Sequence, residues 1–152
     1  MEILSWNVNG LRAGIRKGFL EWLSSCNAEI IGLQEVRARM EQLPETMQQV
    51  EEWKFSLSAA ERPGYSGVGL ISRKKPDRIE TSMKEEIFDI EGRLQIADFE
   101  NLRIANVYFP NGNGKNRDNS RVPYKLSFYQ CLFDFLEEEK EKGRPLLVMG
   151  DF

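Results

Sequence analysis

The sequence contains no histidine among its 152 residues. This absence excludes His-ligated metal sites and nucleophilic catalysis by Ser–His or Cys–His pairs within the chain. Any metal ion would have to be bound through oxygen atoms. Oxygen ligands favour a hard cation, so the cofactor that we expect, if there is one, is Mg²⁺ or Mn²⁺.

Cysteines and long apolar runs are also scarce. The 2 cysteines, Cys26 and Cys131, are far apart and lie in helical patterns, so we expect reduced, buried thiols rather than a disulfide. No apolar run approaches the roughly 18 residues of a membrane span. The sequence also enters a strand-like pattern at Met1 without a signal-peptide core. We therefore expect a cytoplasmic protein without membrane association.

The charge balance lacks the basic excess that is typical of nucleic-acid-binding proteins, since the net charge is -3. Net charge does not report how charges are distributed, and acidic side chains around a bound cation contribute to the same total. The charge balance therefore argues only mildly against DNA binding. The hydrophobic fraction of 41% and the charged fraction of 30% are typical of one globular domain of this length.

A short apolar run at residues 30–36 (IIGLQEV) has a carboxylate near its end. Its length favours a buried strand over a helix. A strand that is buried on both faces should not end in Glu35 unless this charge has a partner, because an unpaired buried charge is strongly unfavourable. A cation is the simplest partner, so Glu35 is a candidate metal ligand. An exposed acid at a polar strand end is the alternative interpretation.

The pattern around this run predicts a layered α/β domain. A strand at residues 3–8, a loop between Gly10 and Gly14 that carries Arg12 and Arg16, a helix at 17–25 and the strand at 30–35 form a strand–helix–strand unit. Further strands are predicted at residues 53–57, 68–71, 78–83, 94–99, 102–108 and 146–149, and further helices after Pro44 and at 127–142. Many short strands and few helices indicate a largely antiparallel or mixed sheet.

Several of these strands end in polar residues that share one kind of chemistry. Asn7, Glu35 and Asp151 follow or end strands, and Tyr108 and Asn111 add a phenol and an amide. Together they are suited to bind a divalent cation and a phosphate group. The following Gly/Asn-rich loop carries Lys115, Arg117 and Arg121. A polyanion-binding loop and a solvated, mobile loop are both compatible with this composition.

Five short motifs in these regions resemble one known family. They are residues 5–13 (SWNVNGLRA), 33–36 (LQEV), 91–93 (EGR), 106–111 (NVYFPN) and 149–152 (MGDF). In this order and spacing they are similar to the exonuclease III family of AP endonucleases, within the endonuclease/exonuclease/phosphatase superfamily.

This resemblance implies an α/β fold, a four-layered α/β sandwich of the DNase I-like type. It also implies Mg²⁺-dependent hydrolysis of DNA phosphodiesters in base excision repair. The implied substrate is double-stranded DNA, cleaved on the 5′ side of abasic sites or trimmed at 3′ ends to leave a 3′-hydroxyl.

Matched motif by motif, the resemblance also implies residue roles. Glu35 is similar to the family's metal-binding glutamate, and Asn7 to the Asn that assists the metal site and catalysis. Tyr108 resembles the tyrosine beside the scissile phosphate, and Asp151 the aspartate that orients or deprotonates water. The implied DNA-binding residues are Arg12, Asn111, Lys115, Arg117 and Arg121.

The sequence departs from the family pattern near its end. The Gly-Asp-Phe/Leu-Asn motif stops at Phe152, and the family's later His–Asp pair and further metal-region Asp have no counterpart. We therefore expect residues 1–152 to be the N-terminal part of a single such domain, with one sheet present and the facing sheet beyond Phe152. Such a fragment should self-associate and be inactive alone. A phosphomonoesterase acting on a small or lipid phosphate, and a non-catalytic metal- or DNA-binding fragment, are the alternatives.

Overall fold

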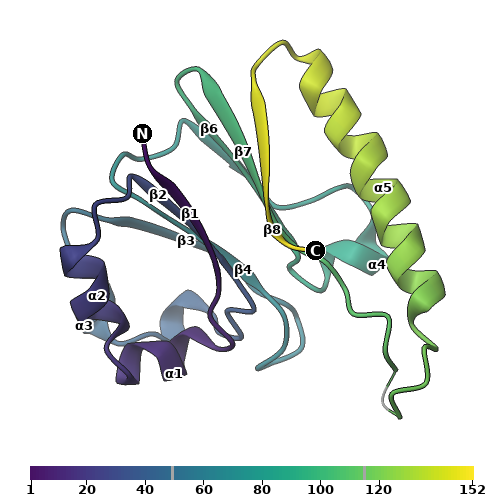
Figure 1. Cartoon of the computed structure of the whole chain (residues 1–152), viewed down its shortest axis with the longest axis horizontal. Coiled ribbons are helices and arrows are strands. Elements are labelled where there is room, and N and C mark those ends of the chain that lie inside the picture. The colour runs from purple at the N-terminus through teal and green to yellow at the C-terminus, as the bar shows by residue number, and fades with distance from the viewer. Residues whose placement is uncertain (49, 115) are drawn as a thin grey trace.

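The computed structural model of the protein describes residues 1–48, 50–114 and 116–152. Two mixed four-stranded sheets pack face to face, and helices cover the outer face of each sheet (Figure 1). This arrangement confirms the predicted four-layered α/β sandwich. Within the described ranges, no helix combines the length and the apolar character that crossing a membrane would require.

The first sheet has the strand order β1-β2-β4-β3. Its strands are β1 (Ile3–Asn7), β2 (Ile30–Gln34), β3 (Lys54–Ser58) and β4 (Val68–Ser72). The central strands β2 and β4 are buried along their whole length, which explains why their sequences are short continuous apolar runs rather than alternating ones. The outer face is covered by α1 (Leu11–Arg16), α2 (Phe19–Ser25), the 3-10 turn η1 (Met40–Gln42) and α3 (Glu45–Gln48).

The second sheet has the strand order β5-β6-β7-β8. Its strands are β5 (Arg78–Glu80), β6 (Leu94–Phe99), β7 (Leu102–Tyr108) and β8 (Leu146–Asp151). β6 and β7 form a tight hairpin, whereas β7 and β8 are parallel and are connected through the long helix α5 (Val122–Glu141). This helix and the short α4 (Glu86–Asp89) cover the outer face.

The helices differ from the sequence prediction in four places. The predicted loop with Arg12 and Arg16 is the helix α1, because Leu11 and Ile15 lie on one helical face against the first sheet. The predicted helix at 17–25 is shortened to α2, since Gly18 turns the chain with a φ of 98°. Helix α5 begins at Val122 rather than at 127, with Pro123 in its first turn, and α4 was not predicted.

The prediction that the facing sheet lies beyond Phe152 was wrong. Both sheets are built from residues 1–152, and each covers the inner face of the other. The strand patterns alone could not assign strands to separate sheets. An uncovered apolar sheet face was one reason to expect self-association, and this reason no longer applies. The second reason remains: in the described chain, the outermost strands of the two sheets have one edge without a neighbouring strand, where another copy could pair. These strands are β1, β3, β5 and β8.

A buried asparagine fixes one sheet against the other. Asn106 on β7 is fully buried and donates from Nδ2 to the Leu33 carbonyl at 3.1 Å and the Gly69 carbonyl at 2.8 Å. Its Oδ1 accepts a hydrogen bond from Gln34 Nε2 at 2.7 Å. Gly32 is required opposite it, because an added Cβ would lie 2.9 Å from Asn106 Oδ1 and would also meet Met149. These buried polar contacts favour one register of the two sheets, because a shift would leave the Asn106 amide without partners.

A buried ion network joins the second sheet to α5. Arg103 donates from Nε and Nη2 to the two carboxylate oxygens of Asp98 at 2.6 and 2.9 Å, and from Nη1 to Glu139 Oε2 at 2.5 Å. Arg144 approaches Asp98 at 3.2 Å. Hydrogen bonding from Arg103, and its charge, hold the pKa of Asp98 below its usual value despite burial.

We predict that Asp98→Asn destabilises the protein by roughly 3–5 kcal/mol at neutral pH, because Arg103 would lose its two-pronged carboxylate partner and keep only Glu139 in the buried network. A depressed carboxyl pKa stabilises the fold above the unfolded-state value of about 3.9 and loses this effect as pH falls. Urea unfolding should therefore show a large difference at pH 7 that shrinks below about pH 4. Asp134→Asn, at an exposed site on α5, is the control. Equal stabilities of Asp98→Asn and the parent chain at pH 7 would contradict the prediction.

Candidate active site

The strand directions gather the predicted polar strand ends at one end of the sandwich. β1 runs parallel to β2, and β7 runs parallel to β8, so the carboxyl ends of each pair lie side by side. Asn7 is paired in register with Gln34, directly before Glu35, and Tyr108 is paired with Asp151. β1 contacts β8 across the interface, which brings the two pairs together.

Asn7 and Asp151 make a direct contact between the two sheets. Asn7 Nδ2 donates to Asp151 Oδ2 at 2.6 Å, although the residues are 144 positions apart. The amide itself is held because its Oδ1 accepts a hydrogen bond from the Asn9 backbone at 3.0 Å. The arrangement leaves a partly exposed carboxylate in a fixed orientation at the edge of the site.

Glu35 leaves β2 in a left-handed backbone conformation with a φ of 57°. Its carbonyl accepts a hydrogen bond from the Gly10 amide at 2.8 Å, and the next amide, of Val36, donates to the Gly67 carbonyl at 3.0 Å. Because a β-strand cannot continue through this conformation, β2 ends at Gln34 and Glu35 lies just beyond the sheet. Its side chain is 17% exposed and forms an ion pair with Arg37, which also has a positive φ.

Tyr108 is anchored at the end of β7 beside these groups. Its amide donates to the Arg93 carbonyl at 2.9 Å, and its own carbonyl accepts from Arg93 Nη1 at 3.0 Å. Burial raises the pKa of Tyr108 above its usual 10, and the negative charges of Glu35 and Asp151 add to this increase while Arg93 opposes it. The phenol therefore keeps its proton at neutral pH and can donate a hydrogen bond to an anion.

A basic hollow of about 440 Å³ opens beside Glu35 and the start of α1. Three arginines contribute to its wall: Arg12 and Arg16 from α1, and Arg37 from the segment after β2. Its remaining lining residues are Asn9, Gly10, Ala13, Val36 and Gly64. A concentration of cations around backbone and small side chains is suited to a phosphate-rich ligand, which the net charge of -3 did not indicate.

The predicted DNA-binding residues of the Gly/Asn-rich loop are in different situations. Asn111 is exposed, and its Oδ1 accepts a hydrogen bond from the Asn113 amide at 2.9 Å. Arg117 is exposed and has a φ of 58°. Arg121 is instead engaged by Glu91 at 3.0 Å and by the Tyr65 hydroxyl at 3.0 Å. The prediction for Lys115 lies outside the described residues.

Three residues near the site were not predicted to belong to it. Arg37 pairs with Glu35, while Arg93 and Tyr65 belong to a hydrogen-bonded cluster next to Tyr108. The Glu91-Gly-Arg93 motif was the one signal in the sequence that pointed to Arg93. No pattern indicated Tyr65, because it lies in a turn-rich link before β4 whose position depends on tertiary packing.

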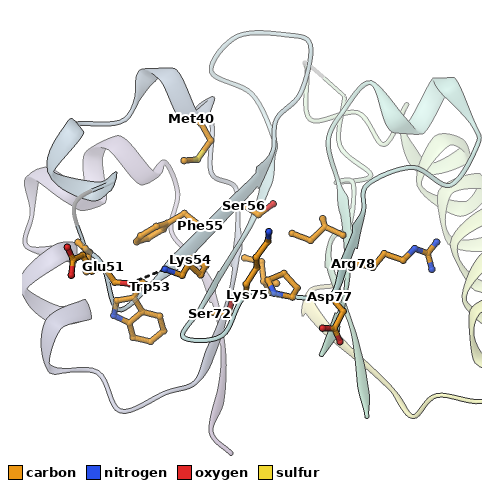
Figure 2. A pocket seen from close by; sticks show the side chains of 14 residues that line it. Met40, Glu51, Trp53, Lys54, Phe55, Ser56, Ser72, Lys75, Asp77 and Arg78 are labelled. Atoms are coloured by element: carbon orange, nitrogen blue, oxygen red, sulfur yellow. Dashed lines mark hydrogen bonds between the residues drawn. The ribbon is translucent and has the colours of Figure 1, made fainter. Parts of the chain in front are cut away.

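A larger hollow lies elsewhere in the described chain. It has a volume of about 1210 Å³ and lies between the edge strands β3 and β5, with Lys54, Ser56, Lys75 and Arg78 around it (Figure 2). None of the predicted site residues lines it. Volume alone would therefore have pointed away from the polar strand ends.

The donor set at the strand ends is sparse for a metal ion. Within residues 1–48, 50–114 and 116–152, no group of three or more Cys, Asp or Glu side chains converges on one point. Glu35 and the amide of Asn7 nevertheless carry oxygen atoms at the shared sheet end that could coordinate a cation. Mg²⁺ is commonly bound by only one or two carboxylates with water and substrate phosphates, so this set fits Mg²⁺ and does not fit a fully enclosed structural metal site.

Comparison with known proteins adds to this geometry. A model of the endonuclease/exonuclease/phosphatase family matches residues 4–152. A Bacillus subtilis (strain 168) exodeoxyribonuclease is 34% identical over 99% of this chain and 58% of its own length. Exodeoxyribonuclease III of Haemophilus influenzae is 32% identical over 99% of the chain and 57% of its own length.

Solved structures have the same fold. The catalytic domain of Xenopus laevis APE2 has a TM-score of 0.81 at 31% identity, with 99% of this chain and 58% of that chain covered. A variant of the 3′ phosphatase NExo from Neisseria, bound to a product DNA hairpin, has a TM-score of 0.83 at 26% identity, with 100% and 57% covered. The chain thus spans a little more than half the length of the relatives that it matches.

Proposed function

The chain belongs to the endonuclease/exonuclease/phosphatase family, and we propose that it supplies part of the active site of an enzyme that hydrolyses DNA phosphodiesters. The proposed reactions are incision at abasic sites and removal of nucleotides from 3′ ends. The observation that carries the proposal is the convergence of Asn7, Glu35, Tyr108 and Asp151 at one sheet end beside a basic hollow. The similarity of the chain to exodeoxyribonucleases supports DNA as the substrate.

Each residue has a chemical role in this proposal. Asp151 accepts a proton from the attacking water, and its hydrogen bond from Asn7 holds the carboxylate in place. Tyr108 donates a hydrogen bond to a phosphate oxygen as charge develops there. The water oxygen bonds to the phosphorus, the P–O3′ bond breaks, and the departing O3′ takes up a proton from solvent, so that a 3′-hydroxyl and a 5′-phosphate are left. A Mg²⁺ or Mn²⁺ ion held by Glu35 and Asn7 would supply positive charge beside the phosphate when bound.

The DNA backbone would lie across the basic hollow. Arg12 at its wall and Asn111 and Arg117 in the exposed loop are the proposed contacts. Such contacts supply affinity and register without reading sequence, as expected for an enzyme that acts on damage or on ends. Arg121 was predicted to take part, and in the described structure its guanidinium is occupied by Glu91.

The proposal also retains the expectation that residues 1–152 do not turn over DNA appreciably alone. The test is an activity assay of residues 1–152 and of the full-length protein, each with Mg²⁺ or with a chelator. Three substrates are compared: a labelled duplex with one abasic site, a blunt duplex and a phosphoinositide. We expect the full-length protein to cleave both DNA substrates only with the metal, and the chain to leave them intact. Release of phosphate from the phosphoinositide instead would identify a phosphomonoesterase and refute the proposal. Family-like turnover by residues 1–152 would refute the expected inactivity.

A further inference from the structure

A buried arginine lies directly behind the predicted catalytic tyrosine. Arg93 is 4% exposed and precedes β6, next to the end of β7. Its carbonyl accepts a hydrogen bond from the Tyr108 amide at 2.9 Å, and its Nη1 donates to the Tyr108 carbonyl at 3.0 Å. Its guanidinium carbon also lies 4.9 Å from the centre of the Tyr108 ring. One residue thus restrains both the backbone and the ring of Tyr108.

The guanidinium is held in turn by two side chains. Arg93 Nε donates to Glu91 Oε2 at 2.6 Å, and Nη2 donates to the Tyr65 hydroxyl at 3.1 Å. All three of its nitrogens are therefore used, each in a different direction. A Lys ammonium could supply the charge at this position but not this planar set of three donors. Burial raises the pKa of Glu91, but hydrogen bonds and charge from Arg93 and Arg121 outweigh this effect, so its pKa lies below the usual value and it stays ionised.

An outer arginine closes the cluster. Arg121 donates to the Tyr65 hydroxyl and to Glu91 Oε1, both at 3.0 Å, and its guanidinium stacks on Tyr124 at 4.4 Å. Tyr65 comes from the link before β4 in the first sheet, whereas Glu91 and Arg93 precede β6 in the second. The cluster therefore connects both sheets and the start of α5 behind a single side chain of the site.

We propose that Arg93, held by Glu91, Tyr65 and Arg121, is a positioning residue that sets the orientation of the Tyr108 ring toward the reacting phosphate. The inference rests on the proposed function for its catalytic consequence, but the orientation of Tyr108 can be measured without catalysis. The orientation of the ring decides where the Tyr108 hydroxyl lies relative to the phosphate. A misplacement of such a catalytic group by about 1 Å can lower the rate by roughly 100-fold. Neither Arg93 nor Arg121 touches the substrate in this role.

The experiment compares Arg93→Lys with Arg103→Lys. Both arginines are 4% exposed, both bind carboxylates, and both lie in or next to the second sheet, but Arg103 belongs to the network of Asp98 and Glu139 away from the site. Fluorine NMR of fluorotyrosine-labelled protein resolves the 4 tyrosines, and a Tyr108→Phe variant assigns the Tyr108 signal. We expect Arg93→Lys to shift and broaden the Tyr108 signal. Arg103→Lys should leave this signal unchanged, although the two variants should lose a similar amount of thermal stability.

The kinetic measurement uses the full-length protein with abasic DNA. Arg93→Lys should lower kcat by roughly 10- to 100-fold with little change in KM, whereas Arg103→Lys should retain both constants. If Arg93→Lys does not fold, Tyr65→Phe replaces it in the experiment. This variant keeps the ring and removes only the hydroxyl that accepts from Arg93, so it should have a smaller effect of the same kind. An unchanged Tyr108 signal in folded Arg93→Lys or Tyr65→Phe would overturn the positioning role. A shifted signal in a protein without activity on DNA would instead retain this role and refute the proposed function.

Discussion

Replacing Glu35 with Gln is expected to weaken binding of Mg²⁺ or Mn²⁺ by at least roughly 10-fold and to reduce metal-dependent turnover by orders of magnitude. The substitution keeps the size of the side chain and removes its charge. The backbone of Glu35 is held through its carbonyl by Gly10, and its side chain is partly exposed, so the fold should be retained. Calorimetric titration with the metal, combined with turnover at saturating metal, measures both effects.

Glu29→Gln is the matched control for this experiment. Glu29 directly precedes β2, so it lies at the opposite end of the same strand, and it pairs there with the N-terminus at 3.4 Å. The change in net charge is identical, but the site is remote. An identical metal titration for Glu35→Gln, Glu29→Gln and the parent protein would exclude Glu35 as the metal ligand.

Asp151→Asn and Tyr108→Phe should each lower kcat by roughly 10²–10³ in the full-length protein while DNA affinity changes little. In Asp151→Asn the side-chain amide oxygen can still accept the hydrogen bond from Asn7, but the amide is too weak a base to take a proton from water. Tyr108→Phe keeps the ring against Arg93 and removes only the donor hydroxyl. Single-turnover cleavage and equilibrium DNA binding should be measured on the same preparations.

Tyr124→Phe is the control for the loss of a hydroxyl. The Tyr124 hydroxyl donates to the Ile87 carbonyl at 3.2 Å, in the layer of α4 and α5. Burial, and to a smaller extent the charge of Glu91, raises the pKa of Tyr124 to about 12. Tyr124→Phe keeps the ring on which Arg121 stacks and removes only the hydroxyl that binds Ile87, so kcat should be unchanged. A variant of Tyr108 or Asp151 that loses DNA binding but keeps kcat would assign that residue to substrate positioning and not to the chemical step.

Local sequence determined much of the fold. The short apolar runs at β2 and β4 were predicted as buried strands from their length, and the structure buries both along their whole length. The strand–helix–strand beginning and the hairpin of β6 and β7 also follow from local patterns. The polar residues that terminate β1, β2, β7 and β8 were recognisable as candidates because a carboxylate or amide at the end of a buried strand is unfavourable without a partner.

Only the tertiary structure decided how these elements combine. Alternation and length indicate that a segment is a strand, but not which sheet it joins, because pairing depends on contacts between residues far apart in the chain. The division into two sheets, the 2.6 Å contact between Asn7 and Asp151, and the cluster around Arg93 all depend on such contacts. The same reason explains the ion pair of Arg121: its place in a basic loop gave no sign that Glu91, from the segment before β6, binds its guanidinium, and its DNA contact stays a prediction.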